Sequence, residues 1–165
     1  MDRIWKFSLV MAAIIIADQI SKGMIQQNFT LGESIPLLDG FFNFTYVRNT
    51  GAAFGMGAGA SETMRRIWFL ALPVVACIWL VVLIWKQRKE NWLLGWAYSL
   101  ILAGAIGNLI DRFSLGYVVD FLDFYYGTTH FPAFNIADSS ITIAGALLIL
   151  EFFISQKKEK ETKAS

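Results

Sequence analysis

The sequence predicts an all-α membrane protein with four transmembrane helices and a small β-sheet in its first outer loop. Hydrophobic residues make up 56% of the 165-residue chain, and its mean hydropathy is +0.51. Charged residues make up 16%, compared with about 25% in an ordinary soluble domain. Four apolar stretches approach the roughly 20 helical residues that cross a bilayer; they cover residues 4–21, 67–85, 92–110 and 136–154.

The first stretch is expected to stay in the membrane as a helix. A cleaved secretory signal is the alternative, because Arg3 and Lys6 precede the apolar run. Cleavage requires a small-x-small pattern after that run, but the run ends in Asp18-Gln19-Ile20-Ser21-Lys22. We therefore expect a retained transmembrane helix with Asp18 near its outer end.

Basic residues near the ends of the stretches predict the orientation, because cytoplasmic loops carry an excess of Lys and Arg. Three regions are basic: the N-terminus, the link between the second and third stretches, and the C-terminal tail. Their residues are Arg3, Lys6, Lys86, Arg88, Lys89, Lys157, Lys158, Lys160 and Lys163. Arg65 and Arg66 count against this assignment but are outnumbered. Both termini are therefore expected in the cytoplasm, with the first and third loops outside.

The first outer loop, residues 23–64, is expected to have structure of its own, because structureless loops of that length are uncommon. Residues 42–47 are rich in aromatic and β-branched side chains and roughly alternate with polar ones, which predicts a strand. Glycines from Gly51 to Gly59 permit tight turns and close backbone approach to a ligand. Ser61 is a candidate N-cap for the second helix.

The chain is expected to form one domain with a short C-terminal tail. A short link makes the second and third helices antiparallel neighbours, and Gly104 with Gly107 provides a small-residue face for helix packing. We expect a single membrane domain, residues 1–155, and a disordered Lys/Glu-rich tail, residues 156–165. No basic stripe suggests a nucleic-acid partner, and we expect the chain to act as a monomer.

Neither a metal nor a cofactor is expected. Cys77 lies alone in the second apolar stretch, and the chain has a single histidine, His130. One Cys and one His cannot supply the usual ligand sets for zinc, and a buried free Cys is commonly a small hydrophobe. His130 is expected to be a loop residue without a catalytic role.

Asp120 and Asp138 are the strongest candidates for chemistry, because carboxylates at membrane depth are costly and usually functional. Asp120 follows the third apolar stretch and Asp138 opens the fourth, so both should lie at the outer membrane face. Taken singly, Asp120 is interpreted as a water-exposed loop carboxylate and Asp138 as the third residue of a helix capped by Asn135. The neighbouring Asp123 is expected to face water.

Taken together, Asp120 and Asp138 indicate acid–base chemistry. A converging pair near an apolar boundary shares one proton, because desolvation and mutual repulsion raise the pKa of one member. Such a pair can activate water and polarise a scissile carbonyl without a metal. A carboxylate at a helix N-terminus is favoured in its ionised form, which predicts Asp138 as the base and Asp120 as the acid.

Further polar residues are expected at the same depth. Asn108 and Arg112 are four residues apart and share a face of the third helix, with Asp111 one step round. Arg112 could pair with Asp18 or Asp111, or bind a phosphate or ester oxygen. The alternative is a buried polar network that only ties the helices together.

Two other classes of function remain open from the residues alone. A small transporter or ion-relay protein could use Asp18, Asp120 and Asp138 to pass protons or cations. Transporters usually show internal repeats or broken helices, and the sequence shows neither. A non-catalytic scaffold, whose polar residues only fix the packing of the helices, is the other possibility.

Five sequence motifs occur in order along the chain. They are Asp18-Gln19-Ile20-Ser21-Lys22, Asn49-Thr50-Gly51-Ala52-Ala53-Phe54-Gly55, Gly104-Ala105-Ile106-Gly107-Asn108-Leu109-Ile110-Asp111-Arg112, Gly116-Tyr117-Val118-Val119-Asp120-Phe121 and Phe134-Asn135-Ile136-Ala137-Asp138. With these motifs the chain resembles the lipoprotein signal peptidases, also called signal peptidase II, along nearly its full length. Two small departures are Ala103, where a Gly often begins the third motif, and Phe131, where a Trp often precedes the Pro.

The resemblance implies an intramembrane aspartic endopeptidase of the bacterial cytoplasmic (inner) membrane, with an extracytoplasmic β-cradle in the first outer loop. Such enzymes remove signal peptides by cutting just before a diacylglyceryl-modified cysteine. The implied partners are diacylglyceryl-modified prolipoprotein signal peptides and membrane lipid. By position, Asp120 and Asp138 would be the catalytic pair. The positions that would bind substrate or shape the site are Asp18, Asn49, Gly51, Asn108, Arg112, Asn135 and Ala137.

Overall fold

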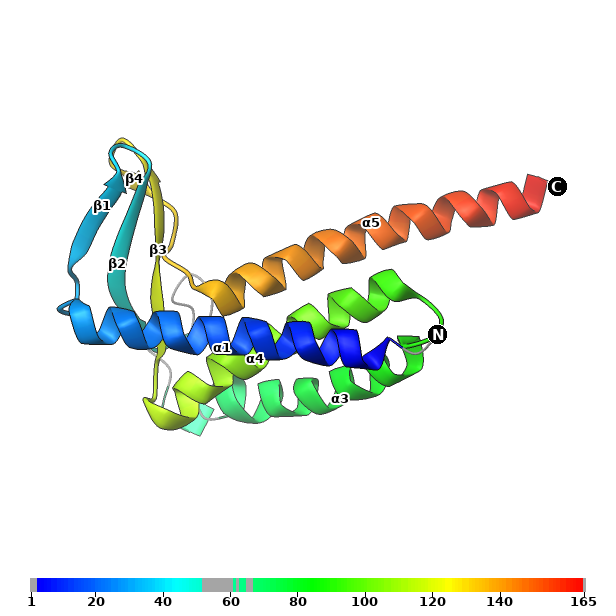
Figure 1. Ribbon diagram of the computed structural model, residues 1–165, viewed down its shortest axis with the longest axis horizontal. Coiled ribbons are helices and arrows are strands. Elements are labelled where there is room, and N and C mark those ends of the chain that lie inside the picture. Colours follow the sequence, from blue (N-terminus) through cyan, green and yellow to red (C-terminus); the bar gives the residue numbers. More distant parts are fainter. Residues whose placement is uncertain (1–2, 52–60, 62, 65–66, 165) are drawn as a thin grey trace.

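The computed structural model describes residues 3–51, 61, 63, 64 and 67–164, which include four helices able to span a membrane (Figure 1). Helix α1 covers Ile4–Asn28. The π-helical turn η2, Ile67–Ala71, leads into α3, Leu72–Gln87, while α4 covers Trp92–Ser114 and α5 covers Ile136–Ala164. The predicted multi-pass membrane fold is confirmed.

Helix α4 lies at the centre of the bundle and packs against α1, α3 and α5. Glycines on α4 allow the closest approaches. A Cβ at Gly104 would overlap the carbonyl oxygen of Ala137 on α5, and a Cβ at Gly107 would lie 2.7 Å from Asp18 Oδ2 on α1. These contacts confirm the small-residue face and bring polar side chains of the three helices together.

Two hydrophobic clusters hold the helices and the sheet. The first lies within the bundle and contains Phe7, Leu80, Ile84 and Leu102. The second joins α1 to the sheet and contains Ile25, Tyr46, Val119 and Phe121. The second cluster matters for the site, because it fixes the strand that carries Asp120 against the helices.

A four-stranded antiparallel sheet lies across one end of the bundle (Figure 1). Its strands are β1, Ser34–Leu38; β2, Phe42–Asn49; β3, Val118–Tyr126; and β4, Thr129–His130, adjacent in that order. Strand β2 confirms the strand predicted over residues 42–47. Strand β2 lies in the connection between α1 and α3, and β3 lies in the connection between α4 and α5. Their register sets Val47 opposite Asp120 and Asn49 opposite Val118.

Strand β3 replaces the loop that was expected between the third and fourth helices. Its first four residues, starting at Val118, are all buried, so the run lacks the alternation that identifies a half-exposed strand. Gly116 makes the turn from α4 with φ of 81°, a backbone conformation that glycine adopts at little cost. The expectation that Asp123 faces water is wrong. Its buried carboxylate accepts a hydrogen bond from Asn43 Nδ2 (3.0 Å) and lies 2.9 Å from His130 Nδ1.

The C-terminal residues differ from the expected disordered tail. Helix α5 continues to Ala164, and the side chains of residues 156–163 are exposed. Pairs four residues apart, such as Lys157 with Glu161, support a helix that is already nucleated in the membrane. The glycine-rich residues 52–60 and the arginines at 65 and 66 lie outside the described residues. For the described Ser61, the hydroxyl accepts from the N–H of Met64 at 3.4 Å, as a helix cap does.

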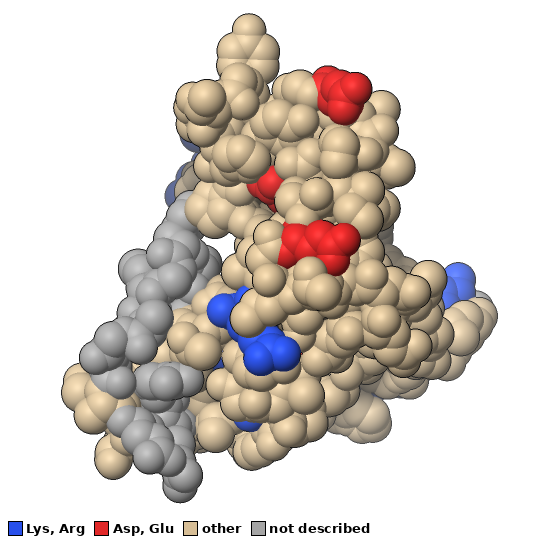
Figure 2. All heavy atoms as spheres, turned by 90° about the vertical axis from the view of Figure 1, so that its left-hand side faces the viewer, with Lys and Arg blue, Asp and Glu red and all other residues tan. Residues whose placement is uncertain are grey.

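Both termini lie at the end of the bundle opposite the sheet (Figure 1). The view onto the sheet end shows acidic side chains over the upper part of that face and basic ones below them, with uncharged surface between (Figure 2). The end of α4 and the beginning of α5, which carry the candidate polar residues, therefore lie next to the sheet and away from the termini.

Candidate active site

A cavity of about 690 Å³ lies where α4, α5, η2–α3 and the sheet meet. Its polar lining includes Asn49, Asn108, Arg112, Asp120 and Asp138. Most of the remaining wall is apolar and comes from Pro73, Ala105, Val118, Phe131, Pro132, Ala133, Phe134, Ile141 and Ile143. The structure therefore brings the two candidate carboxylates to one cavity, whose other lining residues are mostly apolar.

Asp120 lies on β3 and is 2% exposed, in contrast to the water-exposed loop carboxylate of the single-residue interpretation. Two side-chain amides donate to it: Asn135 Nδ2 to Oδ1 at 2.7 Å and Asn49 Nδ2 to Oδ2 at 3.0 Å. Burial, and next the negative charge of Asp138, raise the pKa of Asp120 to about 7 against the opposing effect of the two amides. Asp120 can therefore hold a proton near neutral pH.

Asp138 lies in the first turn of α5, and the predicted helix cap is confirmed. Asn135 Oδ1 accepts from the backbone N–H of Asp138 at 2.9 Å, and Asp138 Oδ2 accepts from the backbone N–H of Asn135 at 3.3 Å. This reciprocal pair is a capping box. The other carboxylate oxygen, Oδ1, accepts from Asn108 Nδ2 at 2.8 Å. Each oxygen of Asp138 thus accepts from one N–H donor, as each oxygen of Asp120 does.

Asn135 connects the two carboxylates. It is fully buried, and its Nδ2 lies 2.7 Å from Asp120 Oδ1, 3.2 Å from Asn108 Oδ1 and 3.2 Å from the Val119 carbonyl oxygen. Its Oδ1 caps the helix that begins with Asp138. A single side chain therefore fixes the strand of one carboxylate relative to the helix of the other.

Asp18 lies behind the pair and does not line the cavity. It is fully buried on α1, and its Oδ1 accepts from the backbone N–H of Ala137 at 2.9 Å. Ala137 is itself fully buried beside Gly107, which leaves room for no larger side chain without movement. Asp18 therefore holds the first turn of α5, one residue before Asp138, against α1.

Arg112 does not form the expected ion pair with Asp18 or Asp111 among the salt bridges of the described residues. Its Nη2 donates to the carbonyl oxygen of Gly51 at 3.0 Å, and the N–H of Gly51 donates to Asn49 Oδ1 at 3.0 Å. Arg112 thus holds the backbone that follows β2, and through it the side chain that donates to Asp120. The guanidinium also lines the cavity.

The partner of Asp18 and Asp111 is Lys22, a residue that the sequence interpretation missed. Lys22 is 2% exposed, and its Nζ lies 2.8 Å from Asp18 Oδ2 and 3.0 Å from Asp111 Oδ2. Asp111 also accepts from Gln19 Nε2 and from the backbone N–H of Val119. The signal that could have identified Lys22 is its place four residues after Asp18 on an otherwise apolar helix.

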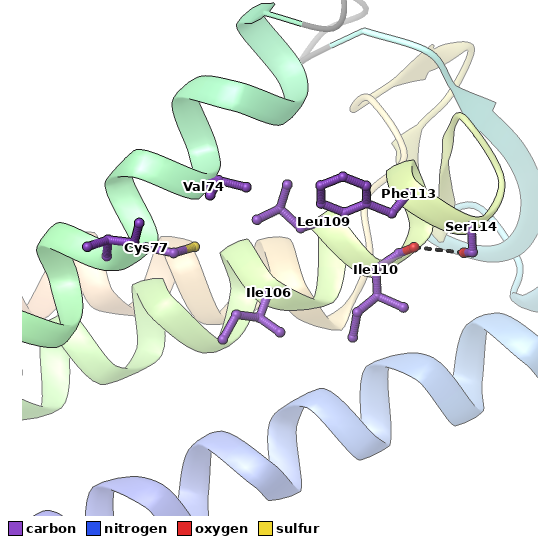
Figure 3. Close-up of a pocket in the computed structure, with 8 residues that line it drawn as sticks. Val74, Cys77, Ile106, Leu109, Ile110, Phe113 and Ser114 are labelled. Atoms are coloured by element: carbon purple, nitrogen blue, oxygen red, sulfur yellow. Dashed lines mark hydrogen bonds between the residues drawn. The ribbon is translucent and has the colours of Figure 1, made fainter.

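A second hollow of about 580 Å³ lies between α3 and α4 and carries no comparable chemistry (Figure 3). Seven of its eight lining residues are apolar or a cysteine: Val74, Cys77, Ile78, Ile106, Leu109, Ile110 and Phe113. The eighth, Ser114, donates its hydroxyl to the carbonyl oxygen of Ile110 at 2.7 Å. The cavity with the two carboxylates is therefore the candidate active site.

Known proteins match this chain over most of its length. The family model described as Signal peptidase (SPase) II matches residues 10–154. The lipoprotein signal peptidase of Shewanella halifaxensis is 49% identical over 156 residues, which cover 93% of this chain and 89% of that protein. The lipoprotein signal peptidase of Shewanella loihica is 52% identical over 151 residues, which cover 90% of this chain and 86% of that protein.

Solved structures share the fold. A bacterial membrane enzyme structure obtained by the in meso method at 2.3 Å resolution has a TM-score of 0.84 and 36% identity, covering 98% of this chain and 97% of the other. A second, at 1.9 Å resolution, has a TM-score of 0.77 and 37% identity, covering 90% and 93%. These similarities confirm the resemblance that the five motifs indicate.

Proposed function

This chain belongs to the signal peptidase II family, and on that premise we propose that it is an aspartic endopeptidase whose catalytic pair is Asp120 and Asp138. As a member of the family it is a multi-pass membrane peptidase that removes signal peptides from prolipoproteins. The observation that carries the proposal is the convergence of both carboxylates on one cavity, one of them with a pKa of about 7. Its most direct test is the pair of Asp→Asn variants argued in the Discussion.

The proposed reaction needs one proton on the pair. In the first step ionised Asp138 takes a proton from water, and the water oxygen bonds to the carbonyl carbon. At the same time the carboxylic acid of Asp120 transfers its proton to the scissile carbonyl oxygen. In the second step the proton on Asp138 passes to the leaving amine nitrogen, and the carbon–nitrogen bond breaks. Asp120 regains a proton from a hydroxyl group of the tetrahedral intermediate as the carboxylic acid product forms. The pair returns to its starting state, so no cofactor is consumed.

The surrounding residues have positioning roles in this proposal. Asn49 and Asn135 donate to Asp120, and Asn108 donates to Asp138. Arg112 holds Gly51, and with it the loop that presents Asn49. Behind them, Asp18 binds the backbone of Ala137 and steadies the turn that carries Asp138.

The substrate proposal rests on the apolar lining of the cavity. These apolar residues come partly from the membrane-spanning helices α3, α4 and α5, which suits apolar ligands that enter from the bilayer. The hydrophobic region of a signal peptide and a diacylglyceryl group are both apolar. We therefore propose cleavage of diacylglyceryl-modified prolipoprotein signal peptides just before the modified cysteine.

The topology completes the proposal. Both termini lie at the end of the bundle away from the site, and the basic residues near them favour the cytoplasmic side. The carboxylates and the sheet then face the outside of the bacterial cytoplasmic membrane, where water is available. We further propose that residues 1–155 form one membrane domain, that residues 156–165 extend into the cytoplasm, and that the chain acts as a monomer.

Removal of the lipid from the substrate is expected to reduce cleavage strongly. Each buried CH₂ of an acyl chain contributes about 0.8 kcal/mol, so an unlipidated precursor should show a kcat/KM at least about 100-fold lower. The measurement compares one precursor peptide with and without its diacylglyceryl group, using purified enzyme in detergent. Equal rates on the two forms would contradict lipid recognition and indicate an ordinary signal peptidase activity.

Activity is expected to decline as the pH rises through about 7, because Asp120 must be protonated and burial places its pKa at about 7. The same carboxyl has an ordinary pKa of 3.8, so its contribution to folding stability is present below that value and is lost as the pH rises through about 7. The kcat/KM profile from about pH 5 to pH 9 measures the alkaline limb.

Asn49→Leu is the matched variant for this profile. The N–H of Asn49 favours the ionised form of Asp120 and lowers its pKa, so the variant should move the alkaline limb to higher pH. A limb that moves to lower pH would show that Asp120 is not the group that titrates.

A further inference from the structure

We infer that Lys22 is a positioning residue for the hydrolysis: it fixes the direction of the Asn108 amide, so that the amide N–H points at Asp138. This inference rests on the proposed function, because it assigns a role around the same carboxylate pair. Lys22 does not line the cavity, and it acts through Asn108.

The contacts of Lys22 use all of its hydrogen-bonding capacity. Its Nζ lies 2.8 Å from Asp18 Oδ2, 3.0 Å from Asp111 Oδ2 and 3.0 Å from Asn108 Oδ1. A lysine ammonium has three N–H donors and no acceptor. Each donor therefore has one partner, and the group is held in one place on a side chain that is 2% exposed.

The donor-only character of Lys22 decides the orientation of Asn108. An asparagine amide presents an oxygen on one side and an NH₂ group on the other, and half a turn of the amide exchanges them. With the oxygen toward Lys22, Asn108 Nδ2 donates to Asp138 Oδ1 at 2.8 Å. In the reversed orientation the NH₂ would face the ammonium, and the amide oxygen would face a carboxylate. Both contacts of the reversed state are repulsive, so Lys22 selects the observed one.

The amide of Asn135 is also oriented by a group that can only donate hydrogen bonds. Its Oδ1 accepts from the backbone N–H of Asp138, another group that can only donate, so its Nδ2 must face Asp120. Asn135 Nδ2 also lies 3.2 Å from Asn108 Oδ1, which gives that oxygen a second donor. Asn108 and Asn135 are thus both oriented by donor-only groups, and of these groups Lys22 is the charged one.

The charged groups around Lys22 explain why its removal should change catalysis by the carboxylate pair. Asp18 on α1 and Asp111 on α4 face its ammonium, and Asp120 on β3, Asp138 on α5 and Arg112 on α4 lie beyond Asn108. Without the ammonium, two buried carboxylates would lose their common cation and would face an amide that is free to turn. The charge of Lys22 also lowers the pKa of Asp120.

The test replaces Lys22 by methionine, which keeps an unbranched side chain of similar length but lacks the charge and the donors. We expect kcat to fall by about 100-fold with KM little changed, as for a small misplacement of a reacting group. The alkaline limb of kcat/KM should also move to higher pH. Gln19→Met is the matched control, because Gln19 donates to Asp111, to the Gly107 carbonyl oxygen and, at 3.3 Å, to Asp18, but has no hydrogen bond to Asn108 among the described residues. This variant should lower thermal stability and leave kcat and the pH profile near wild type.

A double-mutant cycle separates positioning from simple helix packing. If Lys22 acts through Asn108, Lys22→Met should cost almost no further kcat in an Asn108→Leu background, so that the two effects are strongly non-additive. Additive effects, or a Lys22→Met enzyme with wild-type kcat and pH profile, would overturn the inference. If Lys22→Met does not fold, Asn108→Asp is the alternative variant. Its carboxylate keeps an oxygen toward Lys22 but cannot donate a hydrogen bond to Asp138. Wild-type kcat in Asn108→Asp would overturn the inference.

The outcome is separable from that of the proposed function. The aspartic mechanism fails if Asp120→Asn or Asp138→Asn retains cleavage. The role of Lys22 fails alone if those two variants are inactive while Lys22→Met behaves as wild type.

Discussion

Asp120→Asn and Asp138→Asn are each expected to reduce kcat by about 10³-fold or more, because an amide can neither take a proton from water nor donate an acidic one to the carbonyl oxygen. Asparagine has the same shape as aspartate, so binding of the substrate should persist. The measurement is cleavage of a diacylglyceryl-modified precursor peptide by purified protein in detergent. Wild-type cleavage by either variant would contradict the assignment of Asp120 and Asp138 as the catalytic pair.

Both variants should stay folded although they lose activity. Asp120 is 2% exposed and its ionised form is opposed by burial and by Asp138, which favours Asp120→Asn at about pH 8. The asparagine NH₂ group opposes this gain, because it leaves one of the two donors, Asn49 or Asn135, without an acceptor, so the unfolding temperature should change little. Asp138→Asn loses the attraction between a carboxylate and the helix N-terminus, at a cost of about 0.3–1 kcal/mol. Folded but inactive protein is therefore the expected result for both.

Asp123→Asn is the matched control for these variants. Asp123 lies on the same strand as Asp120 and is also buried at 7% exposed, but its partners are Asn43 and His130 and it does not line the cavity. Its replacement should change stability while cleavage stays within about threefold, a barrier change below 1 kcal/mol. Loss of activity in this variant would show that any buried carboxylate of the strand matters, and would weaken the case for the pair.

The sequence predicts the helices and the place of Asp138 well, because these depend on local patterns. Long apolar runs identify the four spans, and Asn135 three residues before Asp138 is a local cap signal that the hydrogen bonds confirm. The ordered motifs also identify the residues that gather around the cavity. Each of these signals lies within a few residues of chain.

The surroundings of Asp120 could not be predicted, because they depend on contacts between distant segments. Its burial requires β3 to pair with β2, whose residues lie more than 70 positions earlier. A strand that follows a helix and begins with four buried residues resembles the end of that helix in its hydrophobic pattern. Lys22 was missed for the same reason: its partner Asp111 lies on another helix, and sequence spacing alone made Arg112 the obvious cation.

The buried polar network around Lys22 bears on the alternative that the polar residues only fix the packing of the helices. Lys22, Asp18 and Asp111 tie α1 to α4, and Asp18 ties α1 to the backbone of α5. A buried network of this kind needs every member to be paired, and it would suffice to fix the helices. It does not explain why Asp120 and Asp138 line a cavity and form no salt bridge among the described residues, whereas Asp18 and Asp111 both pair with Lys22. That difference between the two carboxylate pairs favours chemistry at the cavity.

Asn135→Ala is expected to reduce both stability and activity, because Asn135 both caps α5 and donates to Asp120. Loss of the cap and of buried hydrogen bonds should lower the free energy of unfolding by about 1–3 kcal/mol. Loss of the fixed geometry between the carboxylates should lower kcat by about 100-fold. The two effects are measured separately, by thermal unfolding in detergent and by cleavage of the lipidated peptide.

Asn135→Ser separates these two roles within one position. A serine hydroxyl can accept from the N–H of Asp138 and so restore the cap, but it cannot span Asp120, Asn108 and the Val119 carbonyl as the amide does. Stability should therefore recover by about 1 kcal/mol relative to Asn135→Ala, while kcat stays low. If serine restored both, the cap alone would set the geometry of the site, and the amide that joins the carboxylates would have no catalytic consequence.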